Sequence, residues 1–214
     1  MIWLARIAIA LAIIAAAALL LSGPGTRLGA WPFQVGFWLL RTAAYAGIAA
    51  VLLTATALCI PRIRQGRVAL LSAALALGAG SAAVPLEFLR QARSVPPIND
   101  ISTDLANPAF AEQQRKAYPD IQPLELTEDP ATAYSRALAA AEAMGWEIVR
   151  KDPAAGRIEA VATTAWFGFK DDVLVRITPG ARGSRVDVRS TSRVGRSDIG
   201  TNARRIRAYL QHLK

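Results

Sequence analysis

The fold is decided by the stretch RVDVRSTSRVGRSDIGTNARRI, residues 185–206. Polar and apolar residues alternate along its first ten residues, which is the pattern of a strand with one buried face. On such a strand Arg185, Asp187, Arg189 and Arg193 share one face, and valines occupy the other. The stretch therefore predicts a strand over 185–194, followed by a turn and a helix.

The second half of this stretch predicts how the turn and the helix begin. Gly195 permits a tight turn, and Ser197 or Asp198 is suited to cap a helix that starts there. Apolar residues then recur at helical spacing. The buried stripe expected for this helix comprises Ile199, Ala203, Ile206, Leu210 and Leu213.

The same patterns extend the domain backwards to residue 129. Asp129 before Pro130 predicts a capped helix that ends at Gly145. Three strands are expected between that helix and the final strand, at residues 146–152, 157–165 and 170–178. A helix, a meander of antiparallel strands and a last helix form a two-layer α+β domain over 129–214, similar to the helix-grip arrangement.

The N-terminal half of the chain has a different composition. Three apolar segments, 2–21, 37–60 and 68–89, each approach the ~20 residues that a helix needs to cross a bilayer. They define a membrane region over residues 1–94, with the lipid bilayer as a partner. A cleaved signal peptide is the alternative for the first segment.

The orientation follows from the loop between the second and third segments. That loop carries Arg62, Arg64 and Arg67, and short basic loops remain in the cytoplasm. The C-terminal domain is then expected outside the cytoplasm, whether or not the first segment is retained.

Charge and composition restrict the function classes. The net charge is +9, but +7 of it precedes residue 97, so the domain itself is nearly balanced and nucleic acid is not an expected partner. Cys59 and His212 are the single cysteine and histidine. These counts argue against a disulfide and a cysteine-based metal site, and we expect no metal and no cofactor.

Residues 95–128 form a proline-rich connection. Its prolines favour extended backbone, and its apolar content predicts that it packs on the domain. Asn107 and Pro108 predict the cap and the first residue of a short helix that ends at about Ala117. Three acidic or hydroxyl residues, Asp100, Ser102 and Asp104, are interpreted as turn residues rather than as a cation site.

Four segments carry a resemblance to a known family. PPINDISTD begins at Pro96, YPDIQPL at Tyr118, GRIEAVATTAWFGFKDDVLVRI at Gly156 and SRVDVRSTSRVGRSDIGTNARRI at Ser184. In this order they resemble the bacterial and plastid domain-of-unknown-function family fourteen-ninety-nine, over about residues 95–214. Members often have a histidine where this chain has Asn99. The resemblance implies the domain but no activity, and the three apolar segments lie outside it. From those segments we expect a location in the bacterial inner membrane.

Two motifs are candidates for a ligand site. The arginine face of 185–193 is interpreted either as a salt-bridged surface or as an anion site beside the N-terminus of the last helix. The aromatic motif around Trp166 either closes one end of the core or forms an exposed platform. The residues predicted to bind a ligand are Arg189, Arg193, Asp171, Asp198, Asn202, Trp166 and Lys170.

We therefore expect a non-enzymatic periplasmic module that assembles or maintains the cell envelope. Its predicted partner is an envelope protein or an anionic lipid or glycan, and the sequence gives no indication of an oligomeric state. The alternative is a hydrolase that uses the carboxylates of Asp171 and Asp198 with Arg189 as the electrophile. No residues are assigned to catalysis in the preferred interpretation.

Overall fold

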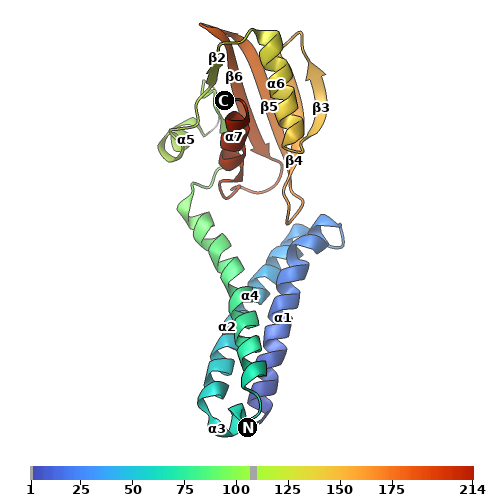
Figure 1. Ribbon diagram of the computed structural model, residues 1–214, viewed down its shortest axis with the longest axis vertical. Coiled ribbons are helices and arrows are strands. Elements are labelled where there is room, and N and C mark those ends of the chain that lie inside the picture. The colour runs from blue at the N-terminus through green and yellow to red at the C-terminus, as the bar shows by residue number, and fades with distance from the viewer. Residues whose placement is uncertain (1, 107–109) are drawn as a thin grey trace. The chain divides into compact units, whose positions relative to one another are not determined.

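The chain forms two compact units (Figure 1), and the computed structural model describes residues 2–106 and 110–214. The first unit extends from the N-terminus to Arg90 and includes the distant segment Ala165–Gly168. The second unit contains Gln91–Thr164 and Phe169–Lys214.

The first unit consists of helices. They are α1 (Ile2–Arg27), α2 (Phe33–Cys59), the short α3 (Pro61–Arg64) and α4 (Val68–Ser94). Three of them, α1, α2 and α4, are long and apolar enough to cross a membrane. Both α1 and α4 continue past the ends of the predicted segments. The prediction ended each segment where the apolar residues end, whereas the helix itself continues through the polar residues that follow. In α4, for example, Arg90 pairs with Glu87 one turn earlier, at 2.7 Å.

Small residues allow the long helices to approach closely. Ala12, Ala50 and Ala74 form one buried cluster that draws on α1, α2 and α4. At Gly47 a Cβ atom would lie 2.6 Å from the backbone oxygen of Gly78, so only glycine fits there. Such close backbone approach is typical of helices packed in membranes.

The aromatic motif contributes to the first unit. The indole Nε1 of Trp166 donates a hydrogen bond to Ser22 Oγ at 3.2 Å. Phe167 is buried and packs edge-to-face on Phe37, with ring centroids 5.1 Å apart. Phe167 therefore neither closes the core of the sheet domain nor forms an exposed platform, which were the two interpretations of this motif.

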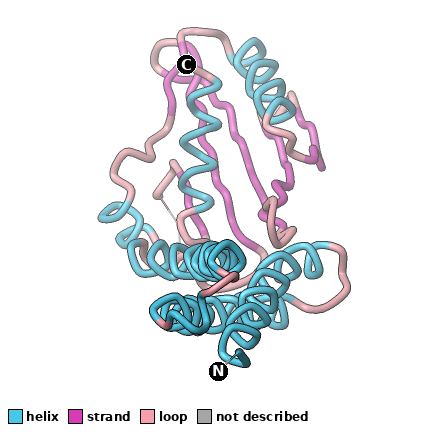
Figure 2. The backbone as a smooth tube through the Cα atoms, turned by 60° about the horizontal axis from the view of Figure 1, so that its bottom comes forward, coloured by secondary structure: helices cyan, strands magenta, loops and turns pink. Residues whose placement is uncertain are grey.

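The second unit is a six-stranded antiparallel sheet with helices on one face (Figures 1 and 2). Its strands are β1 (Asp100–Ser102), β2 (Leu124–Leu126), β3 (Glu147–Asp152), β4 (Arg157–Thr163), β5 (Lys170–Gly180) and β6 (Gly183–Ser192). Its helices are α5 (Ala111–Ala117), α6 (Pro130–Ala143) and α7 (Thr201–His212). The strand order is β1-β6-β5-β4-β3, and β2 also pairs with β6. The predicted α+β class, with long apolar helices before an antiparallel sheet, is confirmed.

The connection over 95–128 supplies two edge strands. Asp100 of β1 lies opposite Thr191, and Leu124 of β2 lies opposite Val186, so both strands pair with the same edge of β6. The helix α5 ends at Ala117, as predicted. Its predicted start at Asn107 and Pro108 lies outside the described residues.

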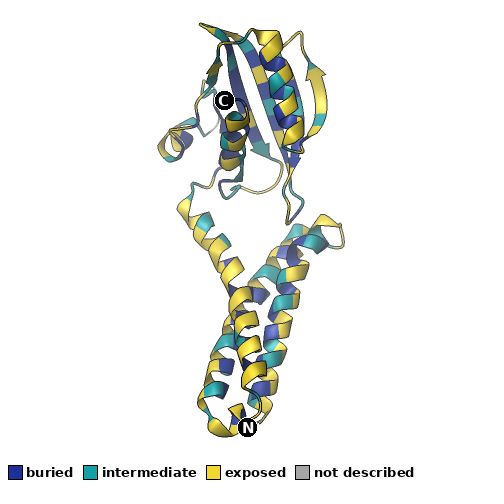
Figure 3. Cartoon of the chain, in the orientation of Figure 1, coloured by how far each residue is buried: buried dark blue, intermediate teal, exposed yellow. Residues whose placement is uncertain are grey.

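The core lies between the sheet and the helices α6 and α7, where buried residues appear in dark blue in Figure 3. Valines and isoleucines of β4, β5 and β6 face alanines of α6. Trp146 stacks on Tyr209 of α7, with ring centroids 4.8 Å apart. The Asp129 side chain accepts hydrogen bonds from the backbone N–H groups of Ala131 and Thr132, which makes it the predicted cap of α6.

The last hairpin is tighter than the sequence suggests. The prediction places a turn over 179–183, whereas β5 continues to Gly180 and β6 begins at Gly183. Only Ala181 and Arg182 connect the two strands, and two-residue connections are common in hairpins. At its other end, β6 stops at Ser192, two residues before the predicted end.

Two glycines with positive φ allow a matched test of the fold. Gly145 has φ 70° and open space around its Cα, whereas Gly156 has φ 61° and a Cβ there would lie 2.2 Å from Ile177 O. Gly145→Ala should lower the free energy of unfolding by about 1 kcal/mol, the strain of a left-handed alanine. Gly156→Ala should lower it by clearly more, because the backbone of β5 must also move.

The measurement is the urea concentration at which half of the second unit is cleaved, in pulse proteolysis of the full-length protein in micelles. If the two variants lower the urea midpoint equally, the close approach of residue 156 to Ile177 O does not affect the free energy of unfolding.

Candidate functional site

Within residues 2–106 and 110–214, no helix lies on one face of the sheet, and we call it the helix-free face. Its outward side chains on β4, β5 and β6 alternate with residues that are buried against α6 and α7. The alternation that the sequence predicts for β6 is therefore present, with Val186 and Val188 buried. The outward side chains include Arg157, Glu159, Asp172, Leu174, Arg176, Arg185, Asp187, Arg189 and Thr191.

Arg189 is held by a carboxylate on the neighbouring edge strand. Its Nε and Nη2 donate to the two carboxylate oxygens of Asp100 at 2.9 and 2.6 Å, and Thr191 Oγ1 donates to Asp100 at 2.8 Å. Burial alone would raise the pKa of Asp100, but these hydrogen bonds and the charge of Arg189 outweigh burial and lower the pKa. The Asp100 side chain is only 8% exposed, so Arg189 neutralises a buried charge that attaches β1.

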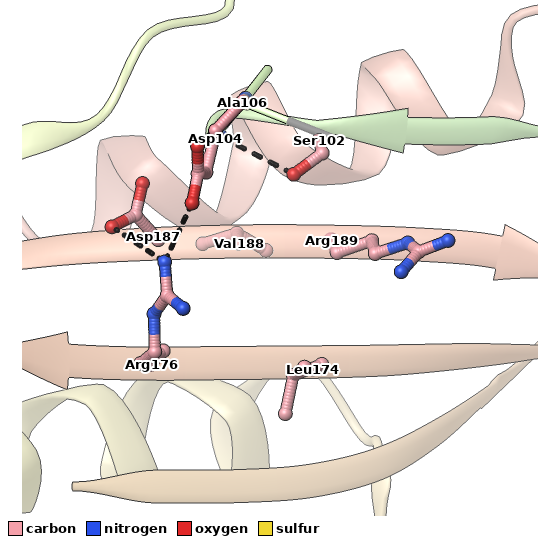
Figure 4. Close-up of a pocket in the computed structure, with 8 residues that line it drawn as sticks. All are labelled: Ser102, Asp104, Ala106, Leu174, Arg176, Asp187, Val188 and Arg189. Atoms are coloured by element: carbon pink, nitrogen blue, oxygen red, sulfur yellow. Dashed lines mark hydrogen bonds and ion pairs between the residues drawn. The ribbon is translucent and has the colours of Figure 1, made fainter. Parts of the chain in front are cut away.

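A second group of ion pairs lies further along β6. Arg185 donates to Asp187 at 3.0 and 3.2 Å, and Thr103 donates to the same carboxylate at 3.1 Å. Figure 4 shows Arg176 reaching from β5 toward Asp187 and toward Asp104, which it contacts at 2.7 Å. Asp104, Arg176 and Asp187 border a hollow of about 180 Å³, which Arg189 also lines. Its cations are thus already paired.

The pair formed by Arg193 differs from that of Arg189. Arg193 donates to Asp172 at distances between 2.6 and 3.1 Å, and both side chains are about half exposed. The hydrogen bond from Arg193 lowers the pKa of Asp172. Because water can solvate both groups, the fold gains little from this pair. Arg193 therefore contributes less to the stability of the fold than Arg189 does.

A larger hollow lies on the same face, and we call it the second hollow. It measures about 380 Å³ and is lined by Val149, Arg157, Glu159, Leu174, Arg189 and Arg193, among others. It falls within the ~300–1,000 Å³ that small-molecule sites occupy. It is the larger of the two hollows described on this face.

Asp171 and Asn202, two of the predicted site residues, lie on the opposite face of the sheet. Asp171 is buried and accepts a hydrogen bond from Arg205 Nη2 at 2.7 Å. Asn202 is also buried, and its side chain bonds to Ser190, Ser192 and Arg205. This network joins α7 to the inner side of β6. It is separated by the sheet from the guanidinium groups of the helix-free face.

Asp198 precedes α7 and caps it. Its carboxylate accepts hydrogen bonds from the N–H groups of Gly200 and Asn202, at 2.8 and 2.6 Å. Burial raises the pKa of this carboxyl, as does the nearby charge of Asp171. The helix begins at Thr201, later than predicted, because Ile199 and Gly200 both have positive φ and interrupt the helix. The Asp198 carboxylate thus occupies the N–H group of Asn202, one of those that an anion at this helix end would use.

The remaining two predicted residues are Trp166 and Lys170. Trp166 belongs to the first unit and bonds to Ser22. Lys170 begins β5 on the helix-free side, where its Nζ is 3.8 Å from Glu147. The seven predicted residues therefore occupy three separate places. Only Arg189, Arg193 and Lys170 share the helix-free face.

The comparison with known families identifies the second unit. The sequence model of a family described as "Protein of unknown function (DUF1499)" matches residues 100–213. The chain belongs to the DUF1499 family. The match begins with β1 and ends in the last turn of the chain, so it covers both the helix-free face and the inner network. No match was found among curated proteins.

Sequence reasoning missed two of the charge pairs in this DUF1499 domain. Asp100 was interpreted as a turn residue, although its partner Arg189 lies 89 positions later in the chain. Arg205 lies in the predicted final helix but was not connected to Asp171. A signal was available for both, because a charged residue within an apolar pattern requires a partner of opposite charge.

The two arginine pairs yield a direct test. Arg189→Ala leaves the buried carboxylate of Asp100 without its cation and should lower the free energy of unfolding by about 2 kcal/mol. This is less than the ~3–5 kcal/mol for fully buried pairs, because Arg189 is half exposed. Arg193→Ala should change it by less than ~1 kcal/mol.

Urea-dependent proteolysis of the full-length protein measures both variants. Adding Asp100→Asn to Arg189→Ala should recover part of the loss, because the buried charge is then removed. Equal effects of Arg189→Ala and Arg193→Ala would contradict the conclusion that only the Arg189 pair contributes substantially to the stability of the fold.

Proposed function

We propose that this protein is a bacterial inner-membrane protein whose DUF1499 domain lies in the periplasm and binds an envelope component without catalysis. The helix-free face is the proposed binding surface. The observation that carries the proposal is its second hollow, where an apolar floor is bordered by arginines that are fixed by carboxylates. Because they are fixed in advance, these arginines lose little freedom when a ligand binds.

The periplasmic location is supported by the charges that flank the helices. Three long apolar helices precede the domain, and the loop that contains α3 carries Arg62, Arg64 and Arg67. If all three helices span the membrane, this loop and the domain are on opposite sides. Basic loops are retained in the cytoplasm, so the proposal assigns the domain to the periplasm.

The hydrolase alternative requires residues that the fold separates. Asp171 points to the helix-covered side of β5 and is paired with Arg205, whereas Arg189 lies on the helix-free face. A carboxylate and an electrophile must converge on one substrate. The sheet between them prevents that, so we do not propose this reaction.

The proposed topology predicts which side of the membrane each region occupies. In a Cys59→Ser background, Gln65→Cys lies in the α3 loop and Glu112→Cys lies on α5, both at exposed positions. A membrane-impermeant maleimide added to intact spheroplasts should label Glu112→Cys but not Gln65→Cys. After lysis both should react. Labelling of Gln65→Cys alone in intact spheroplasts would place the domain in the cytoplasm.

The binding surface predicts where a photo-crosslinker captures a ligand in cells. A photo-reactive amino acid replacing Val149 on the helix-free face should give a discrete adduct. The same residue replacing Ala139, which is exposed on α6, should not. Arg193→Ala should reduce the adduct at position 149, because it removes a cation beside it.

The matched control is Arg207→Ala. Arg207 forms an exposed pair with Asp120, at 2.6 Å, but it is on α7 rather than on the helix-free face. Adduct yield is measured by blotting and adduct mass by spectrometry. Equal yields at positions 149 and 139, or equal losses with Arg193→Ala and Arg207→Ala, would overturn the proposed surface.

A further inference from the structure

The second hollow has an apolar floor that the strand geometry creates. Its apolar contributors include Leu174, near the middle of β5, and Val149 on the edge strand β3. Leu174 lies opposite Glu159 on one side and Arg189 on the other, so charged side chains flank it on both neighbouring strands. An isolated leucine in that position offers a ligand apolar contact within a charged border.

A β-bulge places Val149 at this hollow. The pairing of β3 with β4 skips one residue between Ile148 and Arg150, which makes Val149 the extra residue. Bulges redirect side chains and are frequent beside binding sites. Val149 is 61% exposed while lining the hollow, whereas Ile148 before it packs against the core. The bulge thus presents an apolar side chain that contributes nothing to the core.

The border of the second hollow has an excess of positive charge. Three arginines line it, Arg157, Arg189 and Arg193, against the two acids Glu159 and Asp172. Each arginine has one carboxylate partner: Glu159 for Arg157, Asp100 for Arg189 and Asp172 for Arg193. The carboxylate of Asp100 lies outside the lining and is buried. A ligand in the hollow therefore meets one more cation than anion.

The arginines retain donors for a ligand. Arg189 and Arg193 each use Nε and Nη2 to bind their carboxylate. Among the described residues, Nη1 of neither arginine has a hydrogen-bond partner. A guanidinium fixed through one edge can donate through its remaining nitrogen to an anionic oxygen.

We propose that the second hollow binds an amphiphile with a single anionic group, a phosphate or a carboxylate. The anionic group contacts Arg189 and Arg193, and the apolar part covers Leu174 and Val149. This inference rests on the proposed function and names the ligand class for that surface. One net positive charge suits a monoanion better than a polyanion, because Glu159 and Asp172 would repel further negative groups.

Chain connectivity makes lipids an accessible source of such a ligand. Only residues 95–99 separate α4 from β1, and five extended residues span at most about 18 Å. The domain is therefore joined by a short connection to the helix that we propose to cross the bilayer, which makes bilayer lipids one source of the ligand. A soluble fatty acid offers the same chemistry, so the experiment must distinguish the two sources.

The test uses the full-length protein in nanodiscs of phosphatidylcholine, with methyl-labelled valine and leucine. Dihexanoyl phosphatidylglycerol, a monoanionic lipid that dissolves as a monomer, should shift the Val149 and Leu174 methyl signals in a saturable way. Hexanoate tests the carboxylate source. Dihexanoyl phosphatidylcholine tests the need for net negative charge, and glycerol phosphate tests the headgroup alone. The last two should shift the signals much less.

Matched variants locate the binding. Arg193→Ala should raise the dissociation constant about tenfold or more, because it removes one charge-assisted contact. Val149→Asp, measured from the Leu174 signal, should have an effect of similar size, because it removes the apolar contact and places a negative charge beside an anionic ligand. Arg207→Ala and Ala139→Asp make the same changes of charge away from the hollow and should leave it within about twofold. Neither Arg193 nor Val149 is needed for the core, so both variants should fold.

The outcomes are distinct. Equal shifts with phosphatidylcholine or with glycerol phosphate would overturn the amphiphile class, as would an affinity that Arg193→Ala leaves unchanged. If none of the probes binds while the crosslinker at position 149 still captures an Arg193-dependent adduct, the ligand class is wrong but the proposed surface stands. If neither occurs, both proposals fail.

Discussion

The carboxylate of Asp100 is the contact on which the edge of this domain depends. It is buried where β1 meets β6, and three hydrogen bonds from Arg189 and Thr191 replace the water that it loses. A buried carboxylate without such partners would cost several kcal/mol. Because β1 has only three residues, its backbone bonds alone give it little hold on the sheet. The side-chain pair therefore fixes the point at which the chain enters the domain.

The period of two along β6 then divides the polar residues into two networks. Arg189 and Thr191 point to the helix-free face, while Ser190 points inward to Asn202 and Arg205. Adjacent residues in the sequence thus serve opposite sides of the sheet. The predicted site joined residues from both networks because they are close in sequence. In the fold, strand alternation decides which of them can act on one ligand.

Local patterns allowed much of the fold to be predicted. The alternating valines of β6 and the cap at Asp129 depend on neighbouring residues, and both are present in the structure. The start of α7 was not predictable in this way. Asp198 is a cap as expected, but the positive φ of Ile199 delays the helix, and nothing in the residue type indicates that conformation.

Long-range partners were beyond the sequence for a different physical reason. Asp100 and Arg189 are 89 residues apart, and the aromatic Trp166 bonds to Ser22 across 144 residues. The sequence shows that these side chains are polar or aromatic, but its local spacing does not show which distant residue each of them contacts. Strand pairing is decided by the whole sheet, so its consequences at a site emerge only from the assembled fold. The helix-free face could be predicted as charged, but its pairing could not.

Pairing by carboxylates does not by itself exclude the arginines from binding. An arginine on a flexible surface loses about 2 kcal/mol of side-chain entropy when a ligand fixes it. On this face Arg189 is already fixed by its ion pair with Asp100, which is part of the folded structure because it attaches β1 to the sheet. Its side-chain entropy is therefore lost on folding and not on ligand binding. Arg193 gains the same orientation from the exposed Asp172 with little effect on the fold. The bulged Val149 is likewise not needed for the core. Arg193 and Val149 thus lie beside the same hollow, and neither is needed for the fold. Ligand recognition is a physical role that accounts for both, and it is the role that we propose.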